Sequence, residues 1–415
     1  MIPRRIAFEN IFSFYIFLVI FGYQFFAVFF ELFGSELVNT IGTYFYRGLT
    51  LLVGTFLFLL NFRLNVKRKS IQEGFIYLFF IFWTFFFIRF IYDGLTGKLD
   101  TFIINFYGLN SIFFTFIPAL FLFRNINSLM IKNFAMISFW ALLFVVAFTP
   151  LVFYSNIEES VLTGSRVSLE RLSPIIYGRS CAFLFFISIF LFNMNKINLV
   201  SLFIVCLISV VGIFTSGSRG AILSFALILI LVSLFNIYKT LDIKQFIFIC
   251  IILVFGIFLS ITLTSYFVPE LNLINNLFVT GSFQDKSAQM RYEYYDGALN
   301  QFYQNPLFGD LIIEKRGGLY PHNIFLETFM AMGMVGGLTL LSIIFLVVFK
   351  FFRTLKNKET SQYFIFLYTL FGIIFLAHQF SYSIFHSSEF WSIIILCIFY
   401  KHNSNFDSKS SKKIA

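Results

Sequence analysis

Long runs of apolar residues separated by short polar segments make up most of the chain. Each run covers about 20 residues, the length at which a helix crosses the hydrocarbon core of a bilayer. A backbone in lipid has to satisfy its own hydrogen bonds, and the runs do not alternate as the strands of a membrane β-barrel do, so we expect helices. The predicted spans are 11–33, 38–61, 73–92, 101–123, 131–153, 174–193, 197–215, 220–238, 243–267, 322–349, 361–380 and 388–400.

The distribution of Lys and Arg predicts the orientation of these spans. Basic residues lie in alternate short loops, at 4–5, 63–69, 124–132, 196, 239–244 and 350–358, and in the C-terminal tail. With about twelve spans they all face one side, which the positive-inside rule assigns to the cytoplasm together with both termini. We therefore expect an all-α polytopic membrane protein. It has one transmembrane domain over 1–400, a cytoplasmic tail over 401–415, and a large outer loop with short helices over 268–321.

Composition agrees with a membrane protein and argues against other classes. Hydrophobic residues make up 59% of the chain and charged residues 12%, whereas soluble domains carry about 25% charged residues. The net charge of +10 does not indicate nucleic-acid binding, because the basic residues are spread over short loops. Cys181, Cys206, Cys250 and Cys397 lie in apolar runs, with neither metal-site spacing nor a disulfide framework.

A tight turn between the seventh and eighth spans carries the first candidate site residues. Ser218, Arg219 and Gly220 end the sequence Thr-Ser-Gly-Ser-Arg-Gly at the outer membrane surface. Glycine permits close approach of a ligand, a guanidinium can bind two phosphate oxygens, and the free N–H groups of the following helix favour an anion. The alternative is that Arg219 merely extends to the membrane surface beside a structural turn.

An amphipathic segment in the large loop carries the second set. Apolar and aromatic residues recur every three or four positions over 287–302, which is a helical period, and Pro306 follows it. The predicted helix lies along the membrane surface, with Arg291 and Tyr295 on one face and Tyr292 beside them. Arg291 then either binds substrate or contacts lipid headgroups non-specifically.

The tenth span begins with the third set, His322, Asn323 and Glu327. His322 lies at the water boundary, where an imidazole can accept a proton near neutral pH and serve as a general base. Glu327 is an acid one turn inside an apolar helix, and intramembrane acids are usually functional. Gly333 and Gly337 follow at the G-x-x-x-G spacing typical of helix packing. A lone interfacial histidine is more often structural than catalytic.

Two further arginines fall inside predicted spans, toward their outer ends. Arg47 is most simply explained by a side chain that extends to the membrane surface. Arg89 either does the same or lines a polar cavity, and it joins the candidate substrate-binding residues. His378 and His386 flank the last outer loop at a spacing that does not indicate a metal site.

Taken in order, the three sets resemble the O-antigen ligase and polymerase superfamily. Its pattern is a Gly-Ser-Arg-Gly-type turn, an Arg-aromatic helix that ends near Asn-Pro-x-x-Gly in a large periplasmic loop, and a His-Asn segment followed by glycines. The corresponding segments here are 218–220, 291–309 and 322–337, and the resemblance covers about 205–345.

The resemblance implies a core like that of the GT-C polyprenyl-phosphate-dependent glycosyltransferases, in the bacterial inner membrane with a periplasmic active site. It implies an enzyme that acts without metal or cofactor on polyprenyl-diphosphate-linked donor and acceptor glycans. Our working hypothesis is that Arg219 and Arg291 bind the diphosphate, that His322 orients or deprotonates the acceptor hydroxyl, and that the other candidates bind substrate. Membrane lipid and a chain-length regulator protein are the other expected partners, and nucleic acid is not one.

Within that superfamily we predict a polymerase that joins O-antigen or capsule repeat units with inversion at the anomeric carbon. One alternative is an O-antigen ligase, which transfers the glycan to lipid A core. A lipid-linked oligosaccharide flippase or other transporter would share the span count, but it would not need the long outer loop or an Arg–Arg–His set on one side. A non-catalytic scaffold would tolerate loss of both Arg219 and His322.

Overall fold

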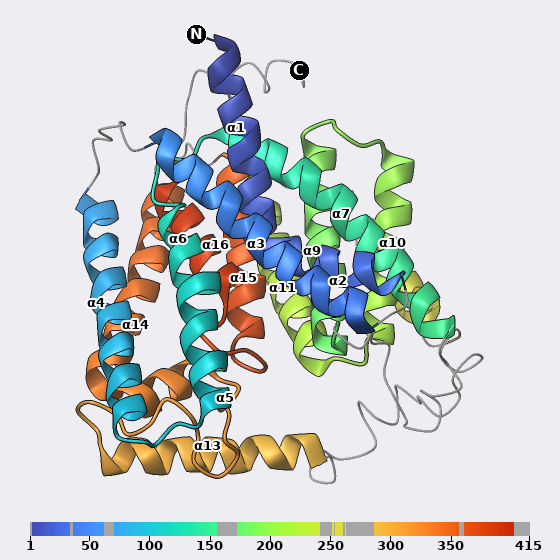
Figure 1. Cartoon of the computed structure of the whole chain (residues 1–415). Coiled ribbons are helices and arrows are strands. Elements are labelled where there is room, and N and C mark those ends of the chain that lie inside the picture. The colour runs from blue at the N-terminus through green and yellow to red at the C-terminus, as the bar shows by residue number, and fades with distance from the viewer. Residues whose placement is uncertain are drawn as a thin grey trace.

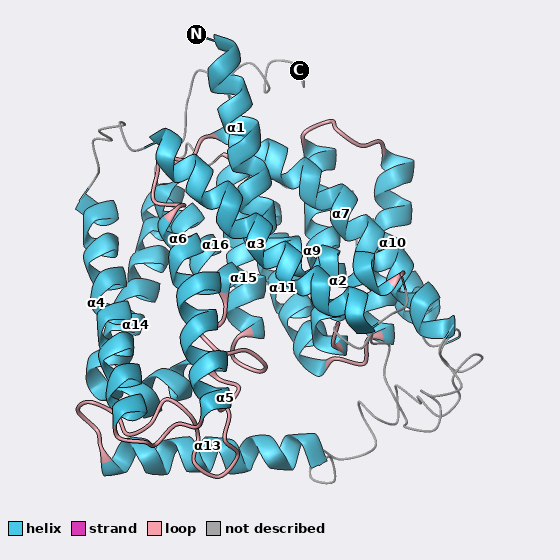
Figure 2. Ribbon diagram, viewed as in Figure 1, coloured by secondary structure: helices cyan, strands magenta, loops and turns pink. Residues whose placement is uncertain are grey.

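The described part of the protein, taken from a computed structural model, is built from helices, with one isolated β-bridge between Ile126 and Tyr400 (Figures 1 and 2). The structure describes residues 2–33, 36–61, 70–155, 172–240, 251–252, 254–259, 262, 286–356 and 361–401. The prediction of an all-α fold is confirmed for these residues.

The helices of the first half follow the predicted apolar runs. They are α1 (Ile2–Phe17), η1 (Leu18–Gly22), α2 (Tyr23–Glu31), α3 (Glu36–Asn61), α4 (Ser70–Leu95), α5 (Thr101–Ile103), η2 (Ile104–Leu109), η3 (Ile112–Phe116), α6 (Ile117–Leu120) and α7 (Ser128–Ser155). The η elements are π-helical turns inside longer helices, so α1, η1 and α2 form one continuous span.

The helices of the second half include one that the hydropathy pattern placed outside the membrane. They are α9 (Pro174–Asn193), α10 (Leu199–Thr215), α11 (Arg219–Thr240), α13 (Lys286–Gln304), α14 (Ile324–Lys356), α15 (Gln362–Ala377) and α16 (Ser388–Phe399). Side chains that accept a hydrogen bond from the first turn cap several of them, as Ser173 does for α9, Asn198 for α10 and Ser361 for α15.

Seven of the described helices are long and apolar enough to cross a membrane, and four shorter apolar helices accompany them. The chain is therefore an integral membrane protein. The count of about twelve spans stays a prediction. The predicted span 243–267 and the loop residues 268–285 lie largely or wholly outside the described residues, as do 156–171 and the tail from 402.

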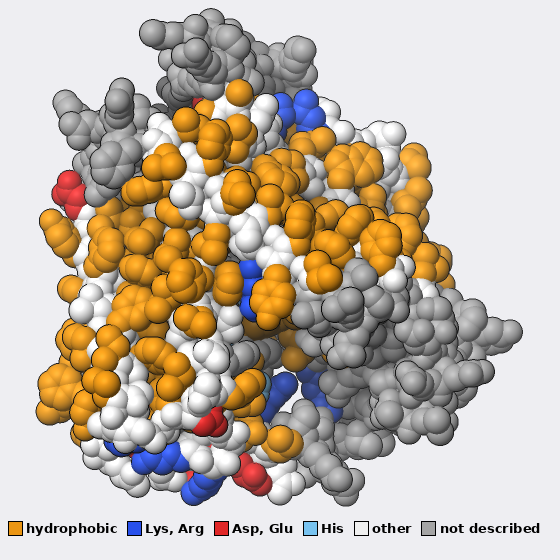
Figure 3. All heavy atoms as spheres, viewed as in Figure 1, with side chains coloured by type: hydrophobic (Ala, Val, Ile, Leu, Met, Phe, Trp, Pro, Cys, Tyr) orange, Lys and Arg blue, Asp and Glu red, His pale blue; other side chains and the backbone are white. Residues whose placement is uncertain are grey.

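Helix α9 lies at the centre of the bundle, where it contacts α7, α10, α11 and α15. Its apolar window is 78% buried inside the protein, against 17% for that of α3, which lies at the periphery. Exposed Phe, Leu and Ile side chains cover the outside of the bundle (Figure 3), as expected of a surface that faces lipid.

The two ends of the bundle differ. At one end, Asn127 donates to the Glu9 carboxylate at 2.8 Å and the Lys401 N–H donates to the Ile126 carbonyl at 2.9 Å, so the beginning of α1 and the end of α16 lie together. At the opposite end, α13 lies across the spans (Figure 1). The prediction of a helix in the large loop is confirmed, and we call this end the α13 end.

A backbone contact between two glycines fixes the segment after α13. Gly333 interrupts α14 with φ 61° and ψ −156°, and Gly309 has φ 77°. The Met334 N–H donates to the Pro306 carbonyl at 2.8 Å. A Cβ on Gly333 would lie 2.5 Å from the Leu307 carbonyl carbon, and one on Gly309 would lie 2.3 Å from the Ala331 oxygen. Gly333 therefore makes a kink that receives the 306–309 backbone, a role that the G-x-x-x-G spacing did not predict.

Candidate functional site

Several candidate residues contact the loop between α15 and α16, residues 378–387, which we call the α15–α16 loop. A Cβ on Gly220 would lie 3.5 Å from Cβ of Phe380. Asn323 Nδ2 donates to the Gln379 carbonyl at 3.3 Å. In the sequence, only the two histidines of this loop, His378 and His386, drew attention to it. The contacts show that it joins the Arg219 turn to the beginning of α14.

His322 immediately precedes α14 in a strained backbone conformation. Its φ is 57°, in the left-handed region that non-glycine residues rarely adopt. The Tyr320 ring packs edge-on against the imidazole, with centroids 4.7 Å apart, and the Tyr294 ring lies 6.1 Å away. His322 Nδ1 is shielded from solvent and has no hydrogen-bond partner among the residues that the structure describes. Such strain is often found at functional sites.

The surroundings of His322 favour its neutral form. Burial lowers the pKa of the imidazole below its usual 6.5, the positive charge of Arg291 lowers it further, and a hydrogen bond with the Ser381 backbone acts in the opposite direction. A neutral imidazole can accept a proton, whereas a protonated one cannot. His322 therefore has the protonation state that a general base needs at neutral pH.

Arg291 on α13 is close enough for its charge to act on both His322 and Tyr295. It makes no ion pair with any residue of the described ranges. Tyr295 is half-buried, and its pKa is raised by burial and lowered in part by Arg291. Tyr292 is 66% exposed. The structure thus brings Arg291, Tyr295 and His322 together and leaves Tyr292 on the outer surface of α13.

The Arg219 turn is built by serine hydroxyls against α9. Ser218 Oγ accepts from the Ala221 N–H at 3.4 Å and so caps α11, and Ser216 Oγ accepts from the Ser218 N–H at 3.2 Å. A Cβ on Gly178 would lie 2.5 Å from Ser216 Oγ, so α9 approaches closely here. Ser218 is buried, while Arg219 and Gly220 are partly exposed.

Asn323 and Glu327 hold the beginning of α14 to the α15–α16 loop. Asn323 Oδ1 accepts from the Phe325 and Leu326 N–H groups at 3.0 and 3.1 Å and thereby caps α14. The Glu327 carboxylate is fully buried and accepts from Ser383 Oγ at 2.5 Å and from the Ile384 N–H at 2.8 Å. Both residues are placed to position His322 and the loop.

Arg89 supports the segment that follows α13. Its guanidinium pairs with Asp93 at 2.6 Å and donates to the Gly309 carbonyl at 3.1 Å, and Asp93 also accepts from the Ile312 N–H at 3.2 Å. Neither of the two sequence interpretations, extension to the surface or a cavity lining, describes these contacts. The spacing of Arg89 and Asp93, one helical turn apart, was a signal in the sequence for such a pair.

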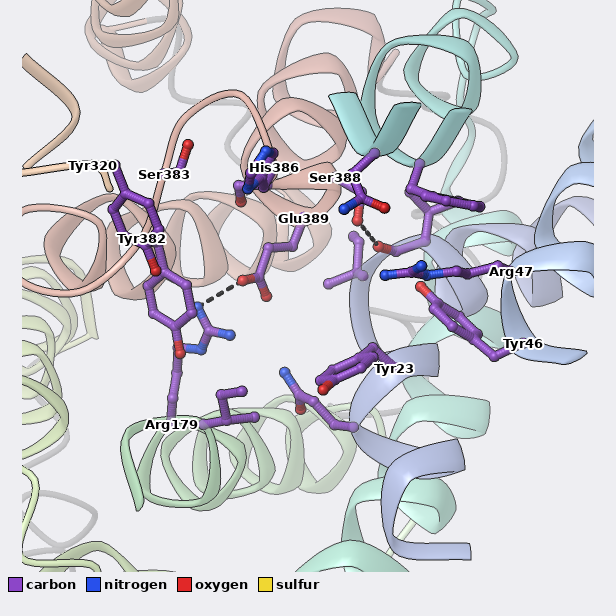
Figure 4. A pocket seen from close by; sticks show the side chains of 17 residues that line it. Tyr23, Tyr46, Arg47, Arg179, Tyr320, Tyr382, Ser383, His386, Ser388 and Glu389 are labelled. Atoms are coloured by element: carbon purple, nitrogen blue, oxygen red, sulfur yellow. Dashed lines mark hydrogen bonds and ion pairs between the residues drawn. The ribbon is translucent and has the colours of Figure 1, made fainter. Parts of the chain in front are cut away.

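A cavity of about 330 Å³, lined by apolar, aromatic and charged side chains, adjoins these residues at the α15–α16 loop. Arg47, Arg179 and Glu389 line it together with Tyr320 and Tyr382 (Figure 4). The outer surface is hollowed between α13 and the membrane helices, and basic side chains are visible there (Figure 3). Arg179 was not predictable as a site residue, because a single arginine in an otherwise apolar run shows nothing of its distant partner Glu389. The sequence pattern assigns Arg47 to the membrane surface, whereas the structure places it at the cavity.

Part of the chain matches the model of one known protein family. Residues 204–309 match the family model described as O-antigen ligase. The match begins in α10, includes the Arg219 turn and α13, and ends at Gly309, and it confirms the resemblance to the O-antigen ligase and polymerase superfamily. None of the curated proteins compared with the chain matches it.

Proposed function

We propose that the protein transfers a glycan from polyprenyl diphosphate to a hydroxyl of an acceptor glycan, at the periplasmic face of the bacterial inner membrane. We infer that it thereby joins the repeat units of an O-antigen or capsule. The observation that carries the proposal is the setting of His322: its Nδ1 is buried and has no hydrogen-bond partner among the described residues, and the charge of Arg291 acts on the imidazole. The family match over 204–309 supports the same class of reaction.

The donor is a sugar attached through C1 to a diphosphate whose negative charge grows as the bond breaks. Arg291 lies on α13, which crosses one end of the bundle, and it forms no ion pair with the acidic residues that the structure describes. Its guanidinium is therefore available to the diphosphate oxygens. Arg219 follows the Ser218 cap at the beginning of α11, where free N–H groups also favour an anion. Preorganised cationic donors of this kind stabilise the transition state more than the ground state.

The acceptor reacts through one of its hydroxyl groups. His322 Nδ1 takes the hydroxyl proton while the oxygen attacks C1 of the donor sugar, and the electrons of the C1–O bond pass to the departing polyprenyl diphosphate. Attack opposite the leaving group inverts the anomeric centre. Glu327 and Asn323 do not take part in these bond changes, but hold the loop and helix that orient His322. The core that carries these residues is proposed to be of the GT-C type.

The second candidate function is that of an O-antigen ligase, and the description of the matching family favours it. The donor chemistry is the same in both candidates, and only the acceptor differs: another lipid-linked repeat unit for a polymerase, lipid A core for a ligase. A chain-length regulator protein is a proposed partner for the polymerase alone.

Deletion of the gene followed by gel analysis of surface glycans tests the proposal. A polymerase deletion should leave lipid A core that bears a single repeat unit, and a ligase deletion should leave the core bare. Each should be restored by the wild-type gene and not by a His322→Ala variant that inserts normally. An unchanged glycan pattern in the deletion strain contradicts both functions.

A further inference from the structure

The cavity at the α15–α16 loop lies at membrane depth and is distinct from the His322–Arg291 pair. Its walls include Val19 and Ile20, which belong to the membrane span Ala7–Glu31, and Tyr46 and Arg47 from inside α3. These walls place the cavity among the membrane-spanning helices. Small-molecule sites usually have volumes of roughly 300–1,000 Å³. At about 330 Å³, the cavity has room for part of a headgroup and not for a whole oligosaccharide.

Two guanidinium groups enter the cavity from opposite sides, with Glu389 between them (Figure 4). Arg179 Nη1 lies 2.7 Å from Glu389 Oε1, and the side chain of Arg179 is only 3% exposed. Its Nε nevertheless has no hydrogen-bond partner in the described part of the chain, and neither has the Tyr382 hydroxyl. With two arginines and one carboxylate, the cavity carries a net positive charge and suits one anionic group.

The remaining lining suits a sugar ring. Arg179 stacks on Tyr382 at 4.2 Å and Arg47 stacks on Phe114 at 4.4 Å, which fixes both guanidiniums against aromatic faces. Tyr320 and Ser383 add aromatic surface and a hydroxyl group. Apolar faces with a few placed polar groups are the usual construction of a site that orients a ligand.

One residue connects the cavity to the proposed general base. Tyr320 lines the cavity and also packs against the His322 imidazole, with centroids 4.7 Å apart. Ser383 likewise lines the cavity and donates to Glu327, which positions the beginning of α14. A ligand in the cavity is therefore adjacent to the base, and a sugar extending past Tyr320 would present a hydroxyl to it.

We propose that this cavity binds the phosphorylated sugar headgroup of the acceptor glycolipid, while Arg219 and Arg291 bind the diphosphate of the donor. Both a lipid-linked repeat unit and lipid A core carry phosphate beside sugar at the lipid end, so the inference holds for polymerase and ligase. The identification of the bound glycolipid as the acceptor rests on the proposed glycosyl transfer. The binding of a phosphorylated sugar in the cavity can be measured without turnover.

The first experiment measures how many molecules of a short-chain probe, farnesyl diphosphoryl N-acetylglucosamine, the purified full-length protein binds in native mass spectrometry. The wild type should bind two. Arg47→Gln and the double variant Arg179→Gln/Glu389→Gln should lose one, with affinity at that site reduced about tenfold or more. The double variant removes the buried pair as a unit, so no unpaired charge is left behind.

Arg124→Gln is the matched control, because Arg124 also stacks on aromatic rings, those of Phe8 and Phe12, but does not line the cavity. It should keep both sites. Two molecules bound to Arg47→Gln would overturn the proposal. Equal competition by phosphatidylglycerol would show a phospholipid site instead, and equal competition by dodecyl glucoside would show that phosphate is not recognised; either result also overturns it.

A second experiment separates the inference from the proposed function. With lipid-linked donor and acceptor, Arg47→Gln should raise the KM for the acceptor and leave slow hydrolysis of the donor by water unchanged. An unchanged acceptor KM would contradict the assignment to the acceptor. If the wild type processes no polyprenyl-diphosphate donor at all, the proposed function fails, while the binding stoichiometry still decides what the cavity holds.

Discussion

At the scale of single residues, the arginines differ in what already neutralises them. Arg89 is paired with Asp93 and Arg179 with Glu389, whereas Arg291 makes no ion pair with a described acid. A guanidinium paired with a carboxylate binds a further anion through the donors that the pair leaves unused, such as the Arg179 Nε, which has no partner among the described residues. We therefore expect substitutions of these arginines to have different effects.

Arg→Lys at Arg219 or Arg291 should reduce transfer by about 10²–10³, because lysine keeps the charge but lacks the planar fork that holds two oxygens. The measurement is polymer amount and length in a deletion strain, alongside a blot for membrane-inserted protein. Arg316→Lys is the matched control, since Arg316 is exposed and its ion-pair partner among the described residues is the exposed Asp296. Wild-type amounts and lengths of polymer from both test variants would contradict diphosphate binding and would indicate that Arg219 and Arg291 only anchor the protein at the membrane surface.

The pH dependence should report His322. Because its pKa lies below the usual 6.5, the base stays neutral as pH falls through 6.5, and kcat/KM should decline only at lower pH. Arg291→Gln removes a positive charge that lowers this pKa, so the acid limb of the residual activity should move to higher pH. A limb in the same place for both proteins would show that His322 is not the titrating group.

Transfer should also continue in the presence of a chelator. The proposed diphosphate site is made of guanidinium and aromatic groups, which do not bind magnesium. The assay is purified protein with lipid-linked donor and acceptor, with and without excess EDTA. Loss of activity on chelation and recovery with magnesium would mean that the arginines alone are insufficient.

At the scale of elements, the sequence located helices well and their junctions poorly. The span predicted over 174–193 coincides with α9, because the length and hydropathy of a run suffice to define a helix in lipid. The role of the α15–α16 loop was not predictable, since Asn323 and Gln379 meet across 56 positions of sequence. The kink at Gly333 was missed because spacing alone does not show a positive φ.

Gly333→Ala tests the kink. The substitution places a side chain in a conformation that only glycine adopts readily, which costs roughly 1–3 kcal/mol, and within 2.5 Å of the Leu307 backbone. The thermal unfolding temperature in detergent and the transfer activity should both fall.

Gly318→Ala provides the control for this substitution. Gly318 also has a positive φ, but a Cβ there would meet nothing within 4 Å. It should show only the smaller cost of backbone strain. Equal losses in Gly318→Ala and Gly333→Ala would mean that the backbone contact with 306–309 contributes nothing.

At the scale of the whole molecule, the candidate residues gather toward one end. The residues next to Glu9 and Lys401 lie at the other end, where Lys350 Nζ donates to the Cys397 and Ile398 carbonyls at the C-terminus of α16. The alternation of basic loops predicted such a division, and the described helices agree with it. What the alternation could not give is the cavity, which combines side chains from α3, α9 and the α15–α16 loop.

Reporter fusions test which compartment each end faces. Fusions after about residues 65, 240 and 355 should report the cytoplasm, and one at about 285 should report the periplasm. A cytoplasmic signal from the fusion at 285 would place α13 in the wrong compartment for a periplasmic transferase.

The contact between Gly309 and Gly333 holds the 306–309 segment to α14 without using its side chains. It is formed by main-chain atoms, while the side chains of Leu307 and Phe308 are 63% and 64% exposed. Substitutions at those two positions leave the main-chain contact in place. The exposed side chains of this segment can therefore change during evolution without loss of the main-chain contact that holds it to α14.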